Sequence, residues 1–277
     1  MLFRSGARFK PQNADPANPA QPLPDVFLRP YIGYLDINIA GPATTTRYDS
    51  LQVQLNRRFA GRFELSGSYT YAKAFVNGYA QQIPSRLRRT LLPNDQTHVM
   101  NVSYVVDLPK GSTLIPVRPA KWVLDNWQVS GVTTFASGFP QNVSLQTTDN
   151  FDFTGGGDGG GVVQTGRAQL SHGDKSFYRW FDTSVFSSPA AGTFGNLGRN
   201  ILSGPGFAHL DASIFRTFKV TERWNVQFRA ESINFSNTPH FNNPNGDITS
   251  PNFGRVTGVN GAPNGPREIQ LGLKVTF

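Results

Sequence analysis

Residues 48–59 of the chain read YDSLQVQLNRRF. Apolar and polar side chains alternate here, which is the period of a β-strand with two different faces. Leu51, Val53, Leu55 and Phe59 share one face, and the other carries Ser50, Gln52, Gln54 and Asn56. After a turn at Ala60–Gly61, the segment Phe63–Tyr71 repeats the alternation. The two segments together predict a hairpin of long strands.

Five further stretches show the same two-residue period: His98–Leu108, Trp127–Phe135, His209–Val220, Trp224–Ser232 and Arg267–Phe277. Tyr31–Ile39 is a candidate for an eighth strand. Strands of about 9–11 residues are longer than most strands of soluble proteins and match a tilted strand that crosses a membrane. The predicted fold class is therefore all-β, an antiparallel up-and-down transmembrane β-barrel segment of about seven or eight strands. Alternation alone also fits a soluble β-sandwich.

The lengths of the connectors favour the barrel. Short connectors (Ala60–Arg62 and Thr221–Arg223) alternate along the chain with long ones, which cover roughly residues 72–97, 136–208 and 233–266. In an up-and-down sheet all the long loops then lie on one side, as in outer-membrane barrels with short periplasmic turns. The connector 109–126 is the exception, because its position predicts a short turn.

Aromatic side chains lie at both ends of the predicted strands. Six lie at the short-turn ends, namely Phe59, Phe63, Trp127, Phe218, Trp224 and Phe277, and three at the long-loop ends, namely Tyr69, Tyr71 and Phe135. Two such belts are typical of the two interfaces of a bilayer and predict an aromatic girdle. The alternative is that these rings fill an ordinary β core.

Composition excludes several other classes. Charged residues make up 16% of the 277 residues and aromatic residues 12%, which argues against a coiled coil and against disorder. The absence of cysteine excludes disulfides, Cys-ligated zinc and thiol catalysis. No apolar run is long enough for a transmembrane helix. The net charge of +8 admits nucleic acid or an anionic membrane surface as a partner.

No motif predicts catalysis, and we expect neither an enzyme nor a bound cofactor or metal. The glycine-rich stretch Thr154–Gly161 contains GxGxxG but precedes no helix, so we interpret it as a flexible loop. The four histidines are far apart in sequence, which argues against a metal site. The basic cluster Ser85–Arg89 lies in a predicted long loop without a platform of aromatic residues, which argues against nucleic-acid binding.

Four charged residues alternate on the polar faces of two adjacent predicted strands: Asp211, Lys219, Arg229 and Glu231. Opposite charges on neighbouring strands pair readily. We expect an ion-pair network that lines the lumen of the barrel rather than a ligand site.

Several segments in combination resemble Oar-like TonB-dependent receptors over residues 27–277. They are Tyr48–Leu55, Arg57–Phe59, Ser68–Tyr71, Phe194–Asn200, Gly204–Gly206, Phe228–Glu231, Asn234, Asn237, Phe241, Asn243–Pro244, Phe253–Gly254 and Gln270–Phe277. Members of that family have a regulatory-like β domain, a plug and a barrel of about 22 strands. The resemblance implies that this chain is the C-terminal portion of such a barrel.

The same resemblance implies the domains, partners and location of the chain. Residues 1–47 are expected to be an N-terminal loop with at most a partial strand, and 48–277 the barrel portion. Leu273, Val275 and Phe277 resemble the terminal signal that the barrel-assembly machinery reads. The expected partners are outer-membrane lipid, that machinery and, through missing N-terminal parts, the TonB complex, while the substrate stays unknown and nucleic acid is not expected. The chain is expected in the cell outer membrane, although Met1–Gly6 does not begin a signal peptide.

Two alternatives remain open from sequence. The first is a small closed structural or adhesion barrel in the outer membrane, in which Tyr31–Ile39 supplies the eighth strand. The second is a secreted soluble β-sandwich, such as a carbohydrate-binding module. Seven or eight strands of a larger barrel would leave two unpaired sheet edges, which are costly in lipid, so we expect a fragment to be unstable alone.

Overall fold

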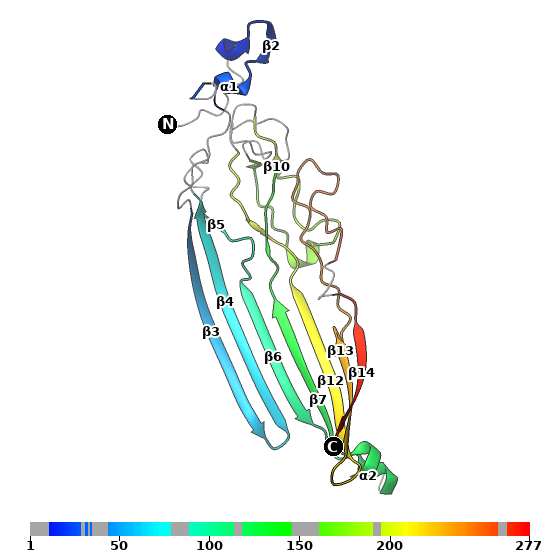
Figure 1. Cartoon of the computed structure of the whole chain (residues 1–277). Coiled ribbons are helices and arrows are strands. Elements are labelled where there is room, and N and C mark those ends of the chain that lie inside the picture. Colours follow the sequence, from blue (N-terminus) through cyan, green and yellow to red (C-terminus); the bar gives the residue numbers. More distant parts are fainter. Residues whose placement is uncertain are drawn as a thin grey trace.

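The computed structural model describes most of the chain as one long curved sheet with loops above it (Figure 1). It describes residues 11–28, 31, 32, 34, 44–78, 89–113, 118–145, 161–190, 195–259 and 265–277. The main sheet has eight strands, seven of them in the order β14-β13-β12-β7-β6-β4-β3, and β5 pairs with β4 beside this path. Every pairing in it is antiparallel. We call this sheet the wall.

The strands of the wall match the predicted ones closely. Their bounds are β3 Thr44–Ala60, β4 Phe63–Gly78, β5 Arg89–Leu91, β6 His98–Asp107, β7 Trp127–Ala136, β12 Phe207–Lys219, β13 Asn225–Ile233 and β14 Glu268–Thr276. The prediction of an all-β, antiparallel, partial barrel is thereby confirmed. In the described part of the chain β3 and β14 each keep one edge without a strand partner, so the barrel is not closed.

The first hairpin is longer than predicted. Gly61 turns the chain with φ of 73°, and the ladder continues upward until Thr44 pairs with Gly78. The predicted strand ends at Tyr71, because the alternation stops there. Beyond it the backbone of β4 gains a different partner, because β5 pairs with it and the N–H of Ala74 donates to Oδ1 of Asp95 at 2.7 Å.

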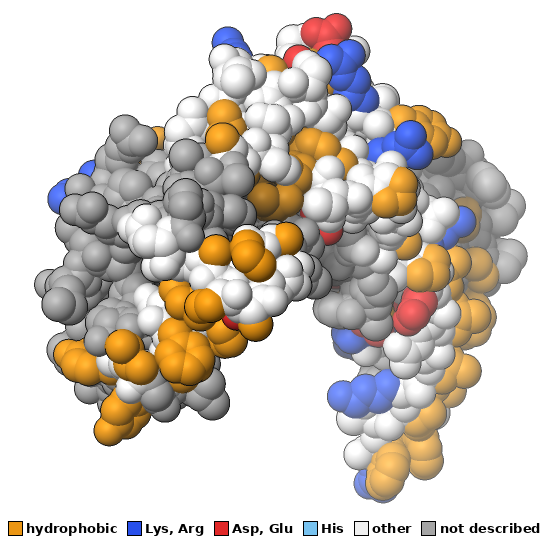
Figure 2. All heavy atoms as spheres, turned by 90° about the horizontal axis from the view of Figure 1, so that it is seen from above, with side chains coloured by type: hydrophobic (Ala, Val, Ile, Leu, Met, Phe, Trp, Pro, Cys, Tyr) orange, Lys and Arg blue, Asp and Glu red, His pale blue; other side chains and the backbone are white. Residues whose placement is uncertain are grey.

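The two faces of the wall differ in polarity. The outer face carries the apolar positions, many of them exposed, such as Leu51, Leu55, Leu271 and Leu273 with exposed fractions of 60–73%. The inner face carries hydroxyl, amide and charged groups. Seen from above, the molecule curves round a hollow, and on the arm at the right hydrophobic side chains follow the outer side (Figure 2).

All three long connectors leave the same rim of the wall. These are 79–97, 137–206 and 234–267, and we call this end the long-loop rim. The other end, the short-turn rim, has the tight turns 61–62 and 220–224. It also has the connector 108–126, which is long because it contains the 3-10 helix η4 (Gly111–Thr113) and the helix α2 (Arg118–Leu124).

The cluster of buried hydrophobic side chains lies in the connectors, whereas the wall buries only the alanines Ala72, Ala74 and Ala136 among the described residues. The buried members of the cluster come from the connector 137–206 and are Val143, Val162, Ala168, Phe181, Phe186 and Leu202. Ile248 and Phe253 of the connector 234–267 pack against them. In the described part of the chain no second sheet covers the outer face of the wall, so the sandwich interpretation is wrong.

Small elements complete the described structure. Short strands pair as β1 (Ala14–Asp15) with β2 (Asn18–Pro22), β8 (Pro140–Gln141) with β11 (Leu202–Ser203), and β9 (Val163–Gln164) with β10 (Phe186–Ser187). The remaining helical turns are η2 (Pro11–Asn13), α1 (Asp25–Leu28) and η5 (His172–Asp174). In the described ranges no helix has the length and apolarity needed to cross a membrane.

The candidate strand Tyr31–Ile39 lies mostly outside the described residues. Tyr31, Ile32 and Tyr34 are exposed and belong to no strand. The other residues of that segment lie outside the described residues.

The polarity of the faces predicts how the wall responds to a new charge. Leu55 is 62% exposed on the outer face, and its row continues through Gly67 to Val102 near the middle of β6. In a closed barrel that contains these strands, Leu55→Lys should lower the free energy of unfolding in lipid vesicles by about 2–4 kcal/mol, because a cation there meets the bilayer. Gln54→Lys, one residue away on the inner face, should change it by less than about 0.5 kcal/mol. Equal losses in denaturant titrations of the two variants would contradict this assignment of faces.

Candidate functional site

A groove of about 500 Å³ runs across the inner face of the wall. Its middle follows one row of paired residues: Glu64, Val105, Ser130, Ser213, Glu231 and Gln270. Glu64 is the second residue of β4, whereas Gln270 is the third of β14, which runs the opposite way. The strands are therefore staggered, as closure into a barrel requires.

The groove is acidic and rich in hydroxyl groups. Glu64, Asp211, Glu231 and Glu268 line it, while no lysine or arginine does so among the described residues. Its serines are Ser66, Ser103, Ser130, Ser213 and Ser232. The hydroxyls of Ser130 and Ser213 lie 2.7 Å apart across β7 and β12. This surface suits a polar, hydrogen-bonding or cationic solute.

The four predicted ion-pair residues are divided among separate contacts. Nη1 of Arg229 donates to Oε1 of Glu231 at 3.2 Å, and its guanidinium lies 5.2 Å from the ring centroid of Phe215. Asp211 pairs with His209, with 2.9 Å between Nε2 and Oδ1. Lys219 ends β12 opposite Asn225 at the short-turn rim. Whether these contacts act together as a lumen network stays a prediction.

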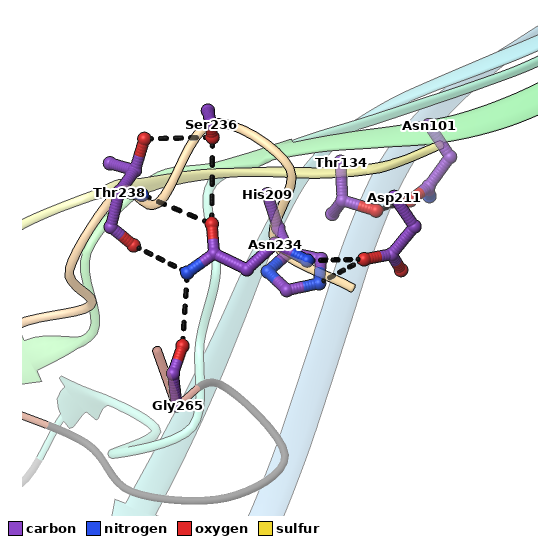
Figure 3. A network of polar contacts seen from close by, with 8 residues as sticks. All are labelled: Asn101, Thr134, His209, Asp211, Asn234, Ser236, Thr238 and Gly265. Carbon is purple, nitrogen blue, oxygen red and sulfur yellow. Dashed lines mark hydrogen bonds and ion pairs between the residues drawn. The ribbon is translucent and has the colours of Figure 1, made fainter. Parts of the chain in front are cut away.

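Asn234 fastens the connector 234–267 to the top of the wall (Figure 3). Its backbone N–H donates to Oδ1 of Asp211 at 2.9 Å. Its Nδ2 donates to the carbonyls of Thr238 at 3.1 Å and Gly265 at 2.9 Å, and its Oδ1 accepts from the N–H of Thr238 at 3.0 Å. The residue is buried at φ of 50°, a left-handed conformation that asparagine tolerates better than most residues.

His209 and His240 meet beside this cluster, although they are far apart in sequence. Their ring centroids are 5.1 Å apart in an edge-to-face arrangement, and Phe207 packs 4.8 Å from His240. Burial is the main cause that lowers the pKa of His240, and His209 lowers it further, while the backbone of Ala208 acts in the opposite sense. The spacing of the two histidines in the sequence does not predict this contact, because only the docking of the connector 234–267 brings the rings together.

The predicted aromatic girdle can now be placed on the wall. Phe63, Trp127, Phe218 and Trp224 lie at the short-turn rim, whereas the side chain of Phe59 lies outside the described residues. Tyr69 and Tyr71 lie mid-strand in β4, but at the level of His98, where β6 begins. Phe135 is next to the upper end of β7. Two levels of rings result, and their role at bilayer interfaces stays a prediction.

The residues that resemble an assembly signal lie along the last strand. Leu273, Val275 and Phe277 have exposed fractions of 73%, 51% and 87%. The first two pair with Phe228 and Val226 on the outer face of β13. The ring of Phe277 lies 5.2 Å from that of Trp224.

The burial of His240 predicts that docking of the connector 234–267 is sensitive to acid. Below the ordinary histidine pKa of 6.5 the undocked state takes up a proton more readily than the docked state, so docking weakens as the pH falls. Limited proteolysis of this connector should accelerate between about pH 7 and pH 5. His240→Phe should remove the acceleration and His172→Asn, at an exposed histidine, should keep it. Equal acid sensitivity of the wild type and His240→Phe would contradict this role.

Comparison with known families agrees with this geometry. The model of the family described as "Outer membrane beta barrel domain" matches residues 5–270. Searches of curated proteins and of solved structures gave no match. The matched stretch includes the wall from β3 to the first residues of β14, together with its loops. The protein is therefore one of the cell outer membrane, and the chain belongs to the outer membrane beta barrel domain family.

Proposed function

We propose that the chain forms the C-terminal wall of an Oar-like TonB-dependent outer-membrane receptor, which binds or takes up a polar solute at the cell surface without catalysis. The observation that carries the proposal is an open wall whose two edge strands run in the same direction. A long-loop rim with its own packed core and an acidic inner groove support it further.

The direction of the edge strands follows from the topology. β3 runs from the long-loop rim to the short-turn rim, and after an unbroken antiparallel series β14 does the same. Neighbouring strands of an antiparallel barrel alternate in direction. The described strands therefore close antiparallel only with an odd number of further strands. In lipid an unpaired edge costs several kcal/mol for each unsatisfied backbone group, so these strands have to be supplied.

The inner groove and the loops suggest how a solute would be bound. A solute that enters from the long-loop rim meets the cluster around Asn234 and Asp211, and then the serines and carboxylates of the groove. Coupling to the TonB complex would run through a plug outside these 277 residues. Outer-membrane lipid and the barrel-assembly machinery are the other proposed partners.

A small closed structural or adhesion barrel is the second candidate, because a single further strand would satisfy the same rule of direction. The DNA upstream of the Met1 codon distinguishes the two. We expect it to encode, in frame, further strands and a plug. A signal peptide directly before Met1, with no plug, would contradict the receptor proposal and favour the small barrel.

The end of β14 gives a test of assembly. Phe277→Ala should reduce the fraction of full-length chain recovered in the outer membrane, because an exposed terminal ring is a proposed contact of the assembly machinery. Phe277→Tyr keeps a ring and should assemble nearly normally. Thr276→Ala is the matched control for a change at the C-terminus. Membrane fractionation with immunoblotting measures all three, and normal recovery of Phe277→Ala would remove Phe277 from the signal.

A further inference from the structure

The described residues of the connector 108–126 form a compact unit at the short-turn rim. Gly111 approaches α2 so closely that an added Cβ would lie 2.8 Å from Cβ of Leu124. Asp125 accepts hydrogen bonds from the N–H and hydroxyl of Ser112 at 2.9 and 2.8 Å. After α2, Asn126 with φ of 61° turns the chain into β7.

This unit lies against the outer face of the wall. The ring of Trp122 is 5.2 Å from that of Phe218, and Nε1 of Trp127 donates to the carbonyl of Val123 at 2.9 Å. Both rings belong to the outer face. Phe218 pairs with Val226 of that face. Trp127 pairs with Arg216, which pairs in turn with Phe228 of the same face. The helix α2 therefore lies on the lipid side of the wall, at the level of the aromatic rings of the short-turn rim.

A buried arginine lies on the same outer face. Arg216 is 4% exposed, and its Nε and Nη1 atoms are shielded from solvent and have no hydrogen-bond partner. Its guanidinium carbon lies 4.4 Å from the ring centroid of Phe218 and 6.0 Å from that of Trp127. The negative charge of Asp125 attracts this guanidinium. Because Nε and Nη1 are shielded from solvent, the guanidinium contributes its positive charge to this surface and not a direct hydrogen bond to a headgroup.

The exposed surface of the unit combines apolar and basic side chains. Trp122, Val123 and Leu124 have exposed fractions of 61%, 47% and 36%, and Lys110 and Lys121 of the same connector are exposed as well. Lys110 and Lys121 with Arg216 give three positive charges against the single negative charge of Asp125. Tryptophan with lysine is typical of the headgroup level of a bilayer, where phosphates attract basic side chains.

We propose that this unit binds the phosphate headgroup of an anionic phospholipid in the leaflet at the short-turn rim, with the exposed Lys110 and Lys121 at the phosphate, the buried charge of Arg216 behind them and Trp122 among the upper acyl carbons. The lipid is favoured over a soluble anion because the surface continues into the outer apolar face, where Val220 and Trp224 are 58% and 47% exposed. The inference depends on the membrane location alone, so it holds for a receptor and for a small closed barrel alike.

The test uses the full chain in micelles of a zwitterionic detergent, titrated with phosphatidylglycerol or phosphatidylcholine that carries brominated acyl chains. Bromine quenches tryptophan fluorescence on contact, so quenching reports lipid near the rings. We expect phosphatidylglycerol to quench at a several-fold lower mole fraction than phosphatidylcholine. Trp122→Phe should remove most of this selective quenching, and soluble glycerophosphate should not compete.

Charge variants separate a site from a generally basic rim. Lys121→Gln should weaken the preference for phosphatidylglycerol about fivefold, as expected for one basic side chain near an anionic surface. Arg223→Gln removes one charge from the turn 220–224 at the same rim and should change the preference less than about twofold. Arg216→Met tests the buried charge, with near-ultraviolet circular dichroism as the check on folding. Equal quenching by the two lipids, or equal effects of Lys121→Gln and Arg223→Gln, would overturn the proposal.

Discussion

The structure depends on one constraint, namely that each backbone N–H and C=O of the wall must find its partner in a neighbouring strand. In a bilayer no water replaces a missing partner. The ladder from β3 to β14 meets this demand within the sheet, and it leaves the side chains free to differ between the two faces. Leucines and valines then occupy the outer face, and serines with carboxylates occupy the inner one. Among the described residues, one edge each of β3 and β14 still lacks such a partner.

Much of the wall could be predicted because alternation is a local signal. The period of Leu51, Val53 and Leu55 identifies both the strand and its face, without knowledge of any contact. The same reasoning stopped β4 at Tyr71, because pairing with Arg89–Leu91 and capping by Asp95 extend it through long-range contacts. The position of the connector 109–126 predicts a short turn, and the alternation of strand directions does not reveal that its extra length holds a helix packed on the outer face.

The candidate site was predictable only in part. Its polar residues follow from alternation, and Arg229 and Glu231 pair because they are two residues apart on one face. The pairing of Asp211 with His209 and the packing of His240 depend on where the connector 234–267 docks. Aromatic and aliphatic residues of the connectors, such as Phe181 and Phe253, have no period that distinguishes a loop core from scattered apolar positions. That core was therefore missed.

The shared core of the connectors 137–206 and 234–267 has a consequence for the variation of the protein. Phe181 and Phe186 from one connector meet Phe253 from the other, edge to face, at 5.3 and 5.8 Å between ring centroids. The two connectors thus form a single cap, although more than sixty residues separate their central rings in the chain. A phage or antibody that selects for change in one of them would act against the packing of the other. Escape variants should accordingly carry paired substitutions, or be confined to the outward positions that this core does not use.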